Sequence, residues 1–305
     1  MEFRTPEGQR RYDEVVASAA NTVVGLDFDG VLSPIVADPA AATIHPDGHR
    51  TLVELAPWVR AVAVITGRPA RQVVSLGGLD QVADALADAR ADAGPDGKPD
   101  ARPDPQPDGT LVYVLGQYGN ERWDSLSREF ISPPAPEGLA AFLDELPSLL
   151  LENGAGEAFV EHKGIAAAVH TRRLSDPLGF FERLLPVLST AAERHGLGVE
   201  PGRFVIEVRA PGMDKGQAVR AIREELGADG FVFAGDDLGD IEAFRSVAAL
   251  RDAGSPGLLV CSGSEEQQAL VALSDVVVDG PAGVLALLRQ LAADAAARDA
   301  AAHER

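Results

Sequence analysis

The sequence predicts an α/β fold: a Rossmann-like parallel β-sheet covered by helices on both faces, with a smaller α/β domain inserted into it. Short apolar runs, such as 22–28, 61–65 and 230–234, alternate with stretches of helical periodicity. Such runs are typical of parallel strands that are buried on both faces. Of the 305 residues, 46% are hydrophobic and only 5% are aromatic, which favours aliphatic layers over an aromatic-rich β-sandwich.

The first segment of the predicted core domain covers residues 1–134. One of its strands ends in Asp-Phe-Asp-Gly and the next in Thr-Gly-Arg-Pro, and both endings favour loops. Ligands of parallel sheets bind beyond the carboxyl ends of the strands, so we expect these loops to converge on one crevice. The elements expected in this segment are strands over 22–28, 61–65 and 110–115 and helices over 47–58 and 68–76.

Residues 83–109 interrupt this pattern. Alternating alanine and aspartate give way to GPDGKPDARPDPQPDG, in which proline, glycine and aspartate dominate. A segment of this composition offers too little apolar surface to form a core. We therefore expect a loosely held surface insertion here and not a domain.

Residues 135–210 are predicted to form a small α/β cap domain. The block reads helix, two strands, helix, two strands, over 137–151, 157–162, 165–172, 176–195, 198–200 and 203–209. The second core segment, residues 211–305, returns to the alternation of strands and helices. It contains a helix opened by Met-Asp-Lys-Gly, strands over 230–234, 258–261 and 275–278, and an alanine-rich final helix after about residue 290.

The charge and the lack of long apolar runs exclude several classes of partner. A formal net charge of -20 argues against nucleic acid, which requires a basic face, and against docking on anionic membranes. No run approaches the roughly 18 apolar residues of a membrane span, and the N-terminus lacks the apolar stretch of a signal peptide. The single cysteine, Cys261, excludes an internal disulfide. We expect a cytoplasmic protein, and a monomer is compatible with the sequence.

The first motif with catalytic potential is Asp27-Phe28-Asp29-Gly30, at the end of the first strand. One of its two carboxylates can attack a phosphorus atom while the other transfers protons. A carboxylate next to a phosphate dianion needs a bridging cation, and Mg²⁺ suits a site of oxygen ligands. A calcium-binding or turn-forming pair of aspartates is the alternative.

Three further motifs follow in chain order. Thr66-Gly67 would let backbone N–H groups approach a phosphate, although a plain turn explains it as well. Lys215 opens a helix and could neutralise a phosphate, and an exposed helix lysine is its alternative. Three acids that repel one another unless a cation lies among them follow strand 230–234: Asp236, Asp237 and Asp240.

Together the four motifs resemble those of the haloacid dehalogenase superfamily of phosphohydrolases, over the whole chain apart from 83–109. The resemblance implies that Asp27 is the nucleophile and Asp29 the general acid and base. It also implies that Thr66 and Lys215 hold the phosphoryl group. The magnesium ligands and supporting acids that it implies are Asp27, the Asp29 carbonyl, Asp236, Asp237 and Asp240.

Within this superfamily the sequence resembles the trehalose-6-phosphate phosphatase family. LDFDGVLSPI, VITGRP, GQYGNE and GDDLGDIEAF are similar to its core motifs, with Val31 in a Thr position and Tyr118 in a His position. FVEHKGIAAAVHTR and GRFVIEVRAPGMDKGQAV are similar to its remaining segments, with Thr171 where Tyr is common. The substrate-binding residues that the resemblance implies are Gly67, Arg68, Tyr118, Glu161, Lys163, His170, Arg203 and Glu207.

The predicted cap residues have the right chemistry for a sugar. Glu161 and Lys163 alternate along a strand and so share one face, where a carboxylate and a cation can make directed hydrogen bonds to hydroxyls. A surface ladder of ion pairs would explain Glu161 and Lys163 equally well without the resemblance. A structural histidine is the alternative for His170.

The resemblance implies a Mg²⁺-dependent phosphatase that hydrolyses a small sugar phosphate, trehalose 6-phosphate, through a phosphoaspartate. One alternative keeps this chemistry and changes the substrate, for example to sucrose 6-phosphate or a mannosyl-3-phosphoglycerate. Another is a non-catalytic regulatory domain, against which the filled catalytic positions speak.

Overall fold

The computed structural model describes residues 3–36, 38–93, 112–202, 204–212, 214–263 and 268–303. The chain divides into two units: unit 1 comprises residues 1–131 and 214–305, and unit 2 comprises residues 132–213. The chain therefore leaves unit 1 once, forms unit 2, and returns. The α/β fold class predicted from the sequence is confirmed.

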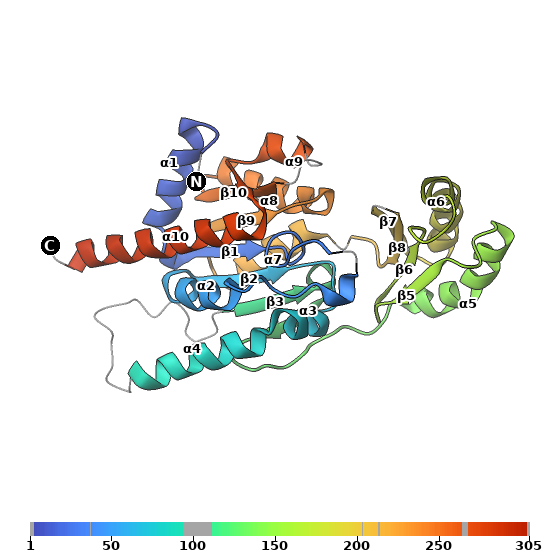
Figure 1. Cartoon of the computed structure of the whole chain (residues 1–305), viewed down its shortest axis with the longest axis horizontal. Helices are drawn as coiled ribbons and strands as arrows, with labels where there is room; N and C mark the ends of the chain where they lie inside the picture. The colour runs from blue at the N-terminus through green and yellow to red at the C-terminus, as the bar shows by residue number, and fades with distance from the viewer. Residues whose placement is uncertain are drawn as a thin grey trace. The chain divides into compact units, whose positions relative to one another are not determined.

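A seven-stranded sheet forms the centre of unit 1, with the strand order β11-β10-β9-β1-β2-β3-β4 (Figure 1). Neighbouring strands are parallel except β3 and β4, which are antiparallel. Every residue of the inner strands β1, β2, β3 and β9 is buried, which explains their continuous apolar sequences. The strands are β1 (Thr22–Leu26), β2 (Ala61–Ile65), β3 (Val112–Gly116), β4 (Glu121–Asp124), β9 (Gly230–Gly235), β10 (Gly257–Gly263) and β11 (Val276–Asp279).

Helices cover both faces of this sheet. Successive strand residues point to opposite faces, so Val24 belongs to one apolar cluster and Val23 to the other. The first cluster contains residues of α1 (Pro6–Ala17), α2 (Gly48–Leu55), α3 (Ala70–Gly77), α4 (Leu79–Ala93) and α10 (Gly280–His303). The second contains residues of α7 (Lys215–Glu225), α8 (Ile241–Asp252) and α9 (Gln268–Leu273). Among the described residues, no helix has the length and apolarity needed to cross a lipid bilayer.

Helix α4 overturns part of the expected insertion. Leu79, Val82, Ala83 and Leu86 are all buried, and their spacing places them on one face of the helix. The alanine and aspartate residues between them obscure this stripe in the sequence. The expectation of a loosely held insertion over 83–109 is therefore wrong for residues 83–93, and residues 94–109 lie outside the described part of the chain.

Helix α1, which the sequence did not predict, is tied to the sheet through a buried carboxylate. Asp275, at 5% exposure, accepts hydrogen bonds from the Arg11 side chain of α1 and from Arg251 of α8 at 2.7 Å. It also accepts one from the backbone N–H of Leu259 in β10 at 2.8 Å. A buried carboxylate is tolerated only when it is paired in this way, so one side chain joins three elements.

Replacing Asp275 by alanine is expected to lower the free energy of unfolding by about 3–5 kcal/mol, because the change leaves buried cationic and N–H groups without their acceptor. Urea unfolding followed by circular dichroism measures this. Asp279→Ala, at the exposed end of β11, is the matched control and should stay within about 0.5 kcal/mol of the parent protein. A similar small loss for both variants would contradict the anchoring role.

Unit 2 is a four-stranded antiparallel sheet with two helices on one face. The strand order is β5-β6-β8-β7. Val169 and Ile206 of the sheet pack with Phe142 of α5 and Leu188 of α6 in one apolar cluster, so the helices and one sheet face form the core of this unit. The elements are α5 (Glu137–Glu152), β5 (Phe159–His162), β6 (Ala166–His170), α6 (Pro177–Arg194), β7 (Gly198–Gly202) and β8 (Val205–Arg209).

Candidate active site

The loop after β1 carries Asp27 and Asp29. The backbone N–H of Asp27 donates to Ala234 of β9 at 3.0 Å, which extends the pairing of the two strands past the end of β1. Asp27 is only 5% exposed. Gly30 has a φ of 68°, and a Cβ there would lie 2.2 Å from an oxygen of Asp236, so only glycine fits this turn. The loops after β1 and β9 are therefore in direct contact.

The acidic loop after β9 is organised by Asp240. One of its oxygens accepts hydrogen bonds from the backbone N–H groups of Asp236 at 2.9 Å and Asp237 at 3.2 Å. Asp237 in turn accepts from the N–H of Gly239 at 2.8 Å. Asp240 is fully buried. Its side chain thus holds the loop in the shape that directs Asp236 toward the loop after β1.

Lys215 lies between the two acidic loops. It opens helix α7, whose N-cap residue Asp214 accepts from the backbone of Gln217 at 2.8 Å. Its Nζ lies 2.8 Å from Asp27 Oδ2 and 2.7 Å from Asp240 Oδ1. The lysine is buried, so it is not the exposed helix lysine that the sequence left open. It neutralises the nucleophile candidate directly.

Arg68, which follows Thr66 and Gly67 at the end of β2, binds Asp29 with two parallel hydrogen bonds. Its Nε and Nη2 donate to the two Asp29 oxygens at 2.6 and 2.8 Å, and its Nη1 donates to the carbonyl of Pro39 at 2.9 Å. Thr66 is buried, and its hydroxyl accepts from the backbone N–H of Arg68 at 3.2 Å. Sequence reasoning assigned Arg68 to the substrate, whereas the structure pairs it with the second aspartate.

Tyr118 and its neighbours contact the loop that follows β2. Gln117 and Tyr118 have φ values of 48° and 60°, an uncommon conformation for residues other than glycine. The Tyr118 N–H donates to the Thr66 carbonyl at 2.9 Å, and the Tyr118 hydroxyl lies where a Cβ on Gly67 would collide. Glu121, which sequence reasoning did not select, accepts from the N–H of Ala70 at 2.7 Å and so caps helix α3.

The carboxylates gather closely enough to bind a cation. One oxygen each from Asp27, Asp236 and Asp240 lie within 4.8 Å of one another. Burial raises the pKa of Asp27 well above its usual value, and the neighbouring carboxylates also raise it. The same causes raise the pKa of Asp236 to about 9. Lys215 acts in the opposite direction on both groups. Burial alone would lower the pKa of Lys215, but Asp240 and Asp27 together hold that pKa well above its usual value. These carboxylates therefore suit a divalent metal ion, which would compensate their charge.

The hydrogen bonds that the clustered carboxylates already accept indicate which of them could bind a metal ion and which supports the loop. Both Asp240 oxygens already accept hydrogen bonds, one from Lys215 and the other from the loop backbone. Asp27 is similarly engaged, since its Oδ1 accepts from the backbone N–H of Phe28 at 2.7 Å and its Oδ2 lies 2.8 Å from Lys215. Of these three acids, Asp236 is thus the best placed to offer a lone pair to a metal ion. Of the four carboxylates that the sequence suggested, Asp237 lies outside the group found among the described residues, and the suggested Asp29 carbonyl is a backbone atom that such a group does not include.

Unit 2 presents a row of charges on the sheet face opposite its helices. Lys163 Nζ lies 2.5 Å from Glu207, which also binds Arg209 at 3.1 Å, and Arg209 binds Glu200 at 3.0 Å. On the neighbouring strands, the His170 imidazole lies 3.0 Å from Glu161. Arg203 lies outside the described residues.

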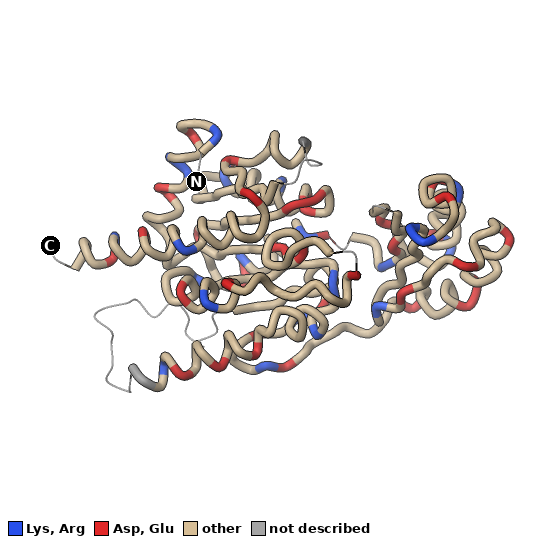
Figure 2. The backbone as a smooth tube through the Cα atoms, viewed as in Figure 1, with Lys and Arg blue, Asp and Glu red and all other residues tan. Residues whose placement is uncertain are grey.

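Sequence reasoning did not select Arg209 and Glu200, which belong to this row of charges. Arg209 follows Glu207 by two positions in β8, so the same alternation that grouped Glu161 with Lys163 could have found it. Glu200 lies opposite Glu207 across β7 and β8, a register that only the structure gives. The coloured backbone in Figure 2 shows that acidic and basic positions are interspersed along the chain.

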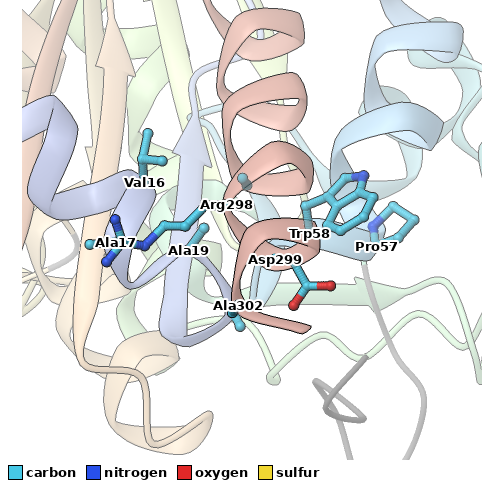
Figure 3. A pocket seen from close by; sticks show the side chains of 10 residues that line it. Val16, Ala17, Ala19, Pro57, Trp58, Arg298, Asp299 and Ala302 are labelled. Atoms are coloured by element: carbon cyan, nitrogen blue, oxygen red, sulfur yellow. The ribbon is translucent and has the colours of Figure 1, made fainter. Parts of the chain in front are cut away.

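The cavity shown in Figure 3 is not lined by the candidate active-site residues. Its volume is about 200 Å³, and its lining includes Val16, Trp58, Arg298 and Asp299, from α1, the turn before β2, and α10. Asp27, Thr66 and Asp236 instead follow the carboxyl ends of β1, β2 and β9.

Comparison with known proteins shows what this chain is similar to. A model of the trehalose-phosphatase family matches residues 154–276. A probable trehalose-phosphate phosphatase of Arabidopsis thaliana is 29% identical over 306 residues, covering 94% of this chain and 72% of that protein. The chain is therefore similar to trehalose-phosphatases over most of its length.

Two further proteins are similar to this chain. A Mycobacterium tuberculosis protein named as an uncharacterised glycosyl hydrolase is 31% identical over 255 residues, and although the match covers 79% of this chain, the chain spans only 17% of that protein. The C-terminal domain of Candida albicans trehalose-6-phosphate phosphatase has a TM-score of 0.68 and 21% identity, covering 96% of this chain and 98% of that one. This last similarity shows that the Candida albicans domain and this chain have the same fold.

Proposed function

We propose that this protein is a Mg²⁺-dependent phosphatase that hydrolyses trehalose 6-phosphate to trehalose and phosphate. The observation that carries the proposal is the buried Asp27 carboxylate, held 2.8 Å from Lys215 and beside Asp236. The similarity to trehalose-phosphatases supports the substrate. Fold alone would not, because one fold serves many functions.

In the proposed reaction Asp27 is the nucleophile. One Asp27 oxygen attacks the phosphorus atom, the bond from phosphorus to the sugar oxygen breaks, and Asp29 gives a proton to the departing oxygen. Asp29 then takes a proton from a water molecule, which attacks the phosphoaspartate, and phosphate leaves as the bond to Asp27 breaks. Lys215 balances the charge that gathers on Asp27 and on the phosphoryl oxygens.

Asp27 and Asp236 would hold the magnesium ion, and Asp240 would fix the loop that carries Asp236. The ion would supply positive charge that offsets the repulsion between the carboxylates and the phosphate dianion. Thr66 and the N–H groups of its loop would bind phosphoryl oxygens. Arg68 orients Asp29 through its two hydrogen bonds. The polar face of unit 2 would supply sugar-binding groups, with Glu161, Lys163 and Glu207 as the first candidates.

Removing divalent metal ions with a chelator is expected to reduce phosphate release to background, and added Mg²⁺ should restore it. Ca²⁺ is the matched control, because it prefers more ligands at longer distances and should restore little activity. Phosphate release from trehalose 6-phosphate is the measurement. Full activity in the chelated protein would contradict the magnesium site.

A panel of substrates separates the proposed function from its alternatives. Trehalose 6-phosphate, glucose 6-phosphate, sucrose 6-phosphate and p-nitrophenyl phosphate would be compared by kcat/KM. A clear preference for trehalose 6-phosphate supports the proposal. A preference for another sugar phosphate would leave the role of Asp27 intact and replace the substrate, and no release from any of them would favour a regulatory domain.

A further inference from the structure

One aromatic side chain of unit 2 lies on the polar face of the sheet. Val160 of β5 packs with the apolar core of this unit, so its neighbours Phe159 and Glu161 point to the opposite face. Phe159 is 47% exposed. In contrast, Phe142, Phe180 and Phe181 pack in the core cluster. Phe159 is not part of the core cluster.

The surroundings of Phe159 combine an aromatic surface with groups that bind hydroxyls. Phe159 pairs across the strands with His170, and their ring centroids are 5.4 Å apart. The His170 imidazole lies 3.0 Å from a Glu161 oxygen. The Arg173 guanidinium lies 5.4 Å from the centroid of the Phe159 ring. These four residues, here called the Phe159 platform, form one continuous patch at the edge of the sheet.

A pyranose ring is complementary to such a patch. One face of the ring consists largely of C–H groups, which an aromatic ring can cover, while its rim carries hydroxyls that need donors and acceptors. Glu161 offers acceptor oxygens, and Arg173 offers donors beside the ring. An isolated phosphate group would make no use of the aromatic surface of Phe159.

We propose that the Phe159 platform binds a hexopyranose ring of the substrate, with Phe159 stacked against its C–H face, and that Phe159 is therefore a specificity-determining residue. This inference rests on the proposed function, because it assumes a sugar phosphate as the substrate. It adds a residue that the sequence motifs did not single out. It also predicts that affinity for the sugar, and not the phosphoryl chemistry, depends on this side chain.

Three substitutions of Phe159 test the platform. Phe159→Ala removes the ring, Phe159→Leu keeps an apolar side chain without the ring, and Phe159→Trp keeps an aromatic surface. The matched control is Leu178→Ala, which truncates another exposed apolar side chain of unit 2, 55% exposed, in the first turn of α6. Circular dichroism and thermal unfolding of each variant establish that it is folded.

Phe159→Ala is expected to raise KM for trehalose 6-phosphate roughly 3- to 10-fold with kcat nearly unchanged. Inhibition by free trehalose, measured on p-nitrophenyl phosphate hydrolysis, should weaken by the same factor. Turnover of p-nitrophenyl phosphate alone should not change, because that substrate has no sugar. Phe159→Trp and Leu178→Ala should behave like the parent protein, and Phe159→Leu should resemble Phe159→Ala.

Other outcomes would overturn the platform. An unchanged KM in Phe159→Ala, or an equal loss on both substrates, would remove Phe159 from sugar binding, as would an equal effect of Leu178→Ala. If the parent protein prefers another sugar phosphate, the proposed substrate fails, and the same variants assayed on that substrate still decide the role of Phe159. If it hydrolyses no sugar phosphate, saturation-transfer NMR with trehalose, sucrose and glucose decides, and no signal for any of them overturns the platform.

Discussion

Replacing Asp27 by asparagine is expected to reduce kcat for phosphate release by at least about 10³-fold, because the amide cannot form the acyl phosphate. The change preserves the size of a side chain that is 5% exposed, and Lys215 keeps its contact with Asp240 at 2.7 Å. The fold should therefore survive. Steady-state phosphate release, with circular dichroism as the test of folding, measures the effect.

A trapping experiment separates a lost nucleophile from a distorted site. After a quench with substrate labelled in its phosphate, the parent protein should carry a label that neutral hydroxylamine releases, as expected for an acyl phosphate. The Asp27→Asn protein should carry none. Substantial turnover by the folded variant, or equal labelling of both proteins, would show that another group attacks the phosphorus atom.

Replacing Lys215 by methionine is expected to lower kcat/KM by about 10²- to 10³-fold, because it removes the charge that stabilises the phosphoryl group and Asp27. The substitution also leaves buried carboxylates without their partner at 2.8 Å and 2.7 Å. In the absence of Mg²⁺ we expect the free energy of unfolding to fall by about 3–5 kcal/mol. Kinetics and urea unfolding measure the two effects.

Added Mg²⁺ distinguishes this explanation from a general loss of packing. A cation that binds among the carboxylates should raise the melting temperature of the Lys215→Met protein more than that of the parent protein. Arg245→Met, on helix α8 with a side chain that is 67% exposed, is the matched control and should change neither activity nor stability appreciably. If Lys215→Met retains most of its activity, the lysine has no part in catalysis.

The position of the candidate site could be predicted because parallel strands share one edge. Asp27, Thr66 and Asp236 each follow a buried apolar strand, and β1 lies between β2 and β9 in the sheet. Neighbouring parallel strands bring such endings together whatever the rest of the chain does. Recognising the strand endings requires only local sequence. The prediction of the site therefore did not depend on the boundaries of the helices, several of which were not predicted.

The two missed helices of unit 1 had weak local signals. The sequence of α1 contains few apolar residues. Only the folded structure shows that Tyr12 and Val15 pack in the core cluster beside the sheet. In α4, alanine and aspartate obscure the stripe formed by Leu79, Val82 and Leu86. Most of the stability of a protein helix comes from tertiary packing, which the periodicity of a short segment reveals only in part.

The sequence by itself determined the α/β class, the order of the catalytic motifs and the residue types at the strand ends, because these depend on local patterns of apolar and polar residues. Only the tertiary structure decided which charges face one another. Arg68 pairs with Asp29, Lys215 with Asp27 and Asp240, and the two members of each contact are far apart in the chain.

The same limit applies to the side chains that support the site. Glu121 caps helix α3, Arg209 joins Glu207 to Glu200, and Phe159 lies on the polar sheet face and not in the core. Each of these contacts depends on strand register or loop geometry, since a hydrogen bond requires its atoms within about 3 Å. Register and loop geometry result from the packing of the whole unit, and for that reason local sequence could name the reacting groups but not their partners.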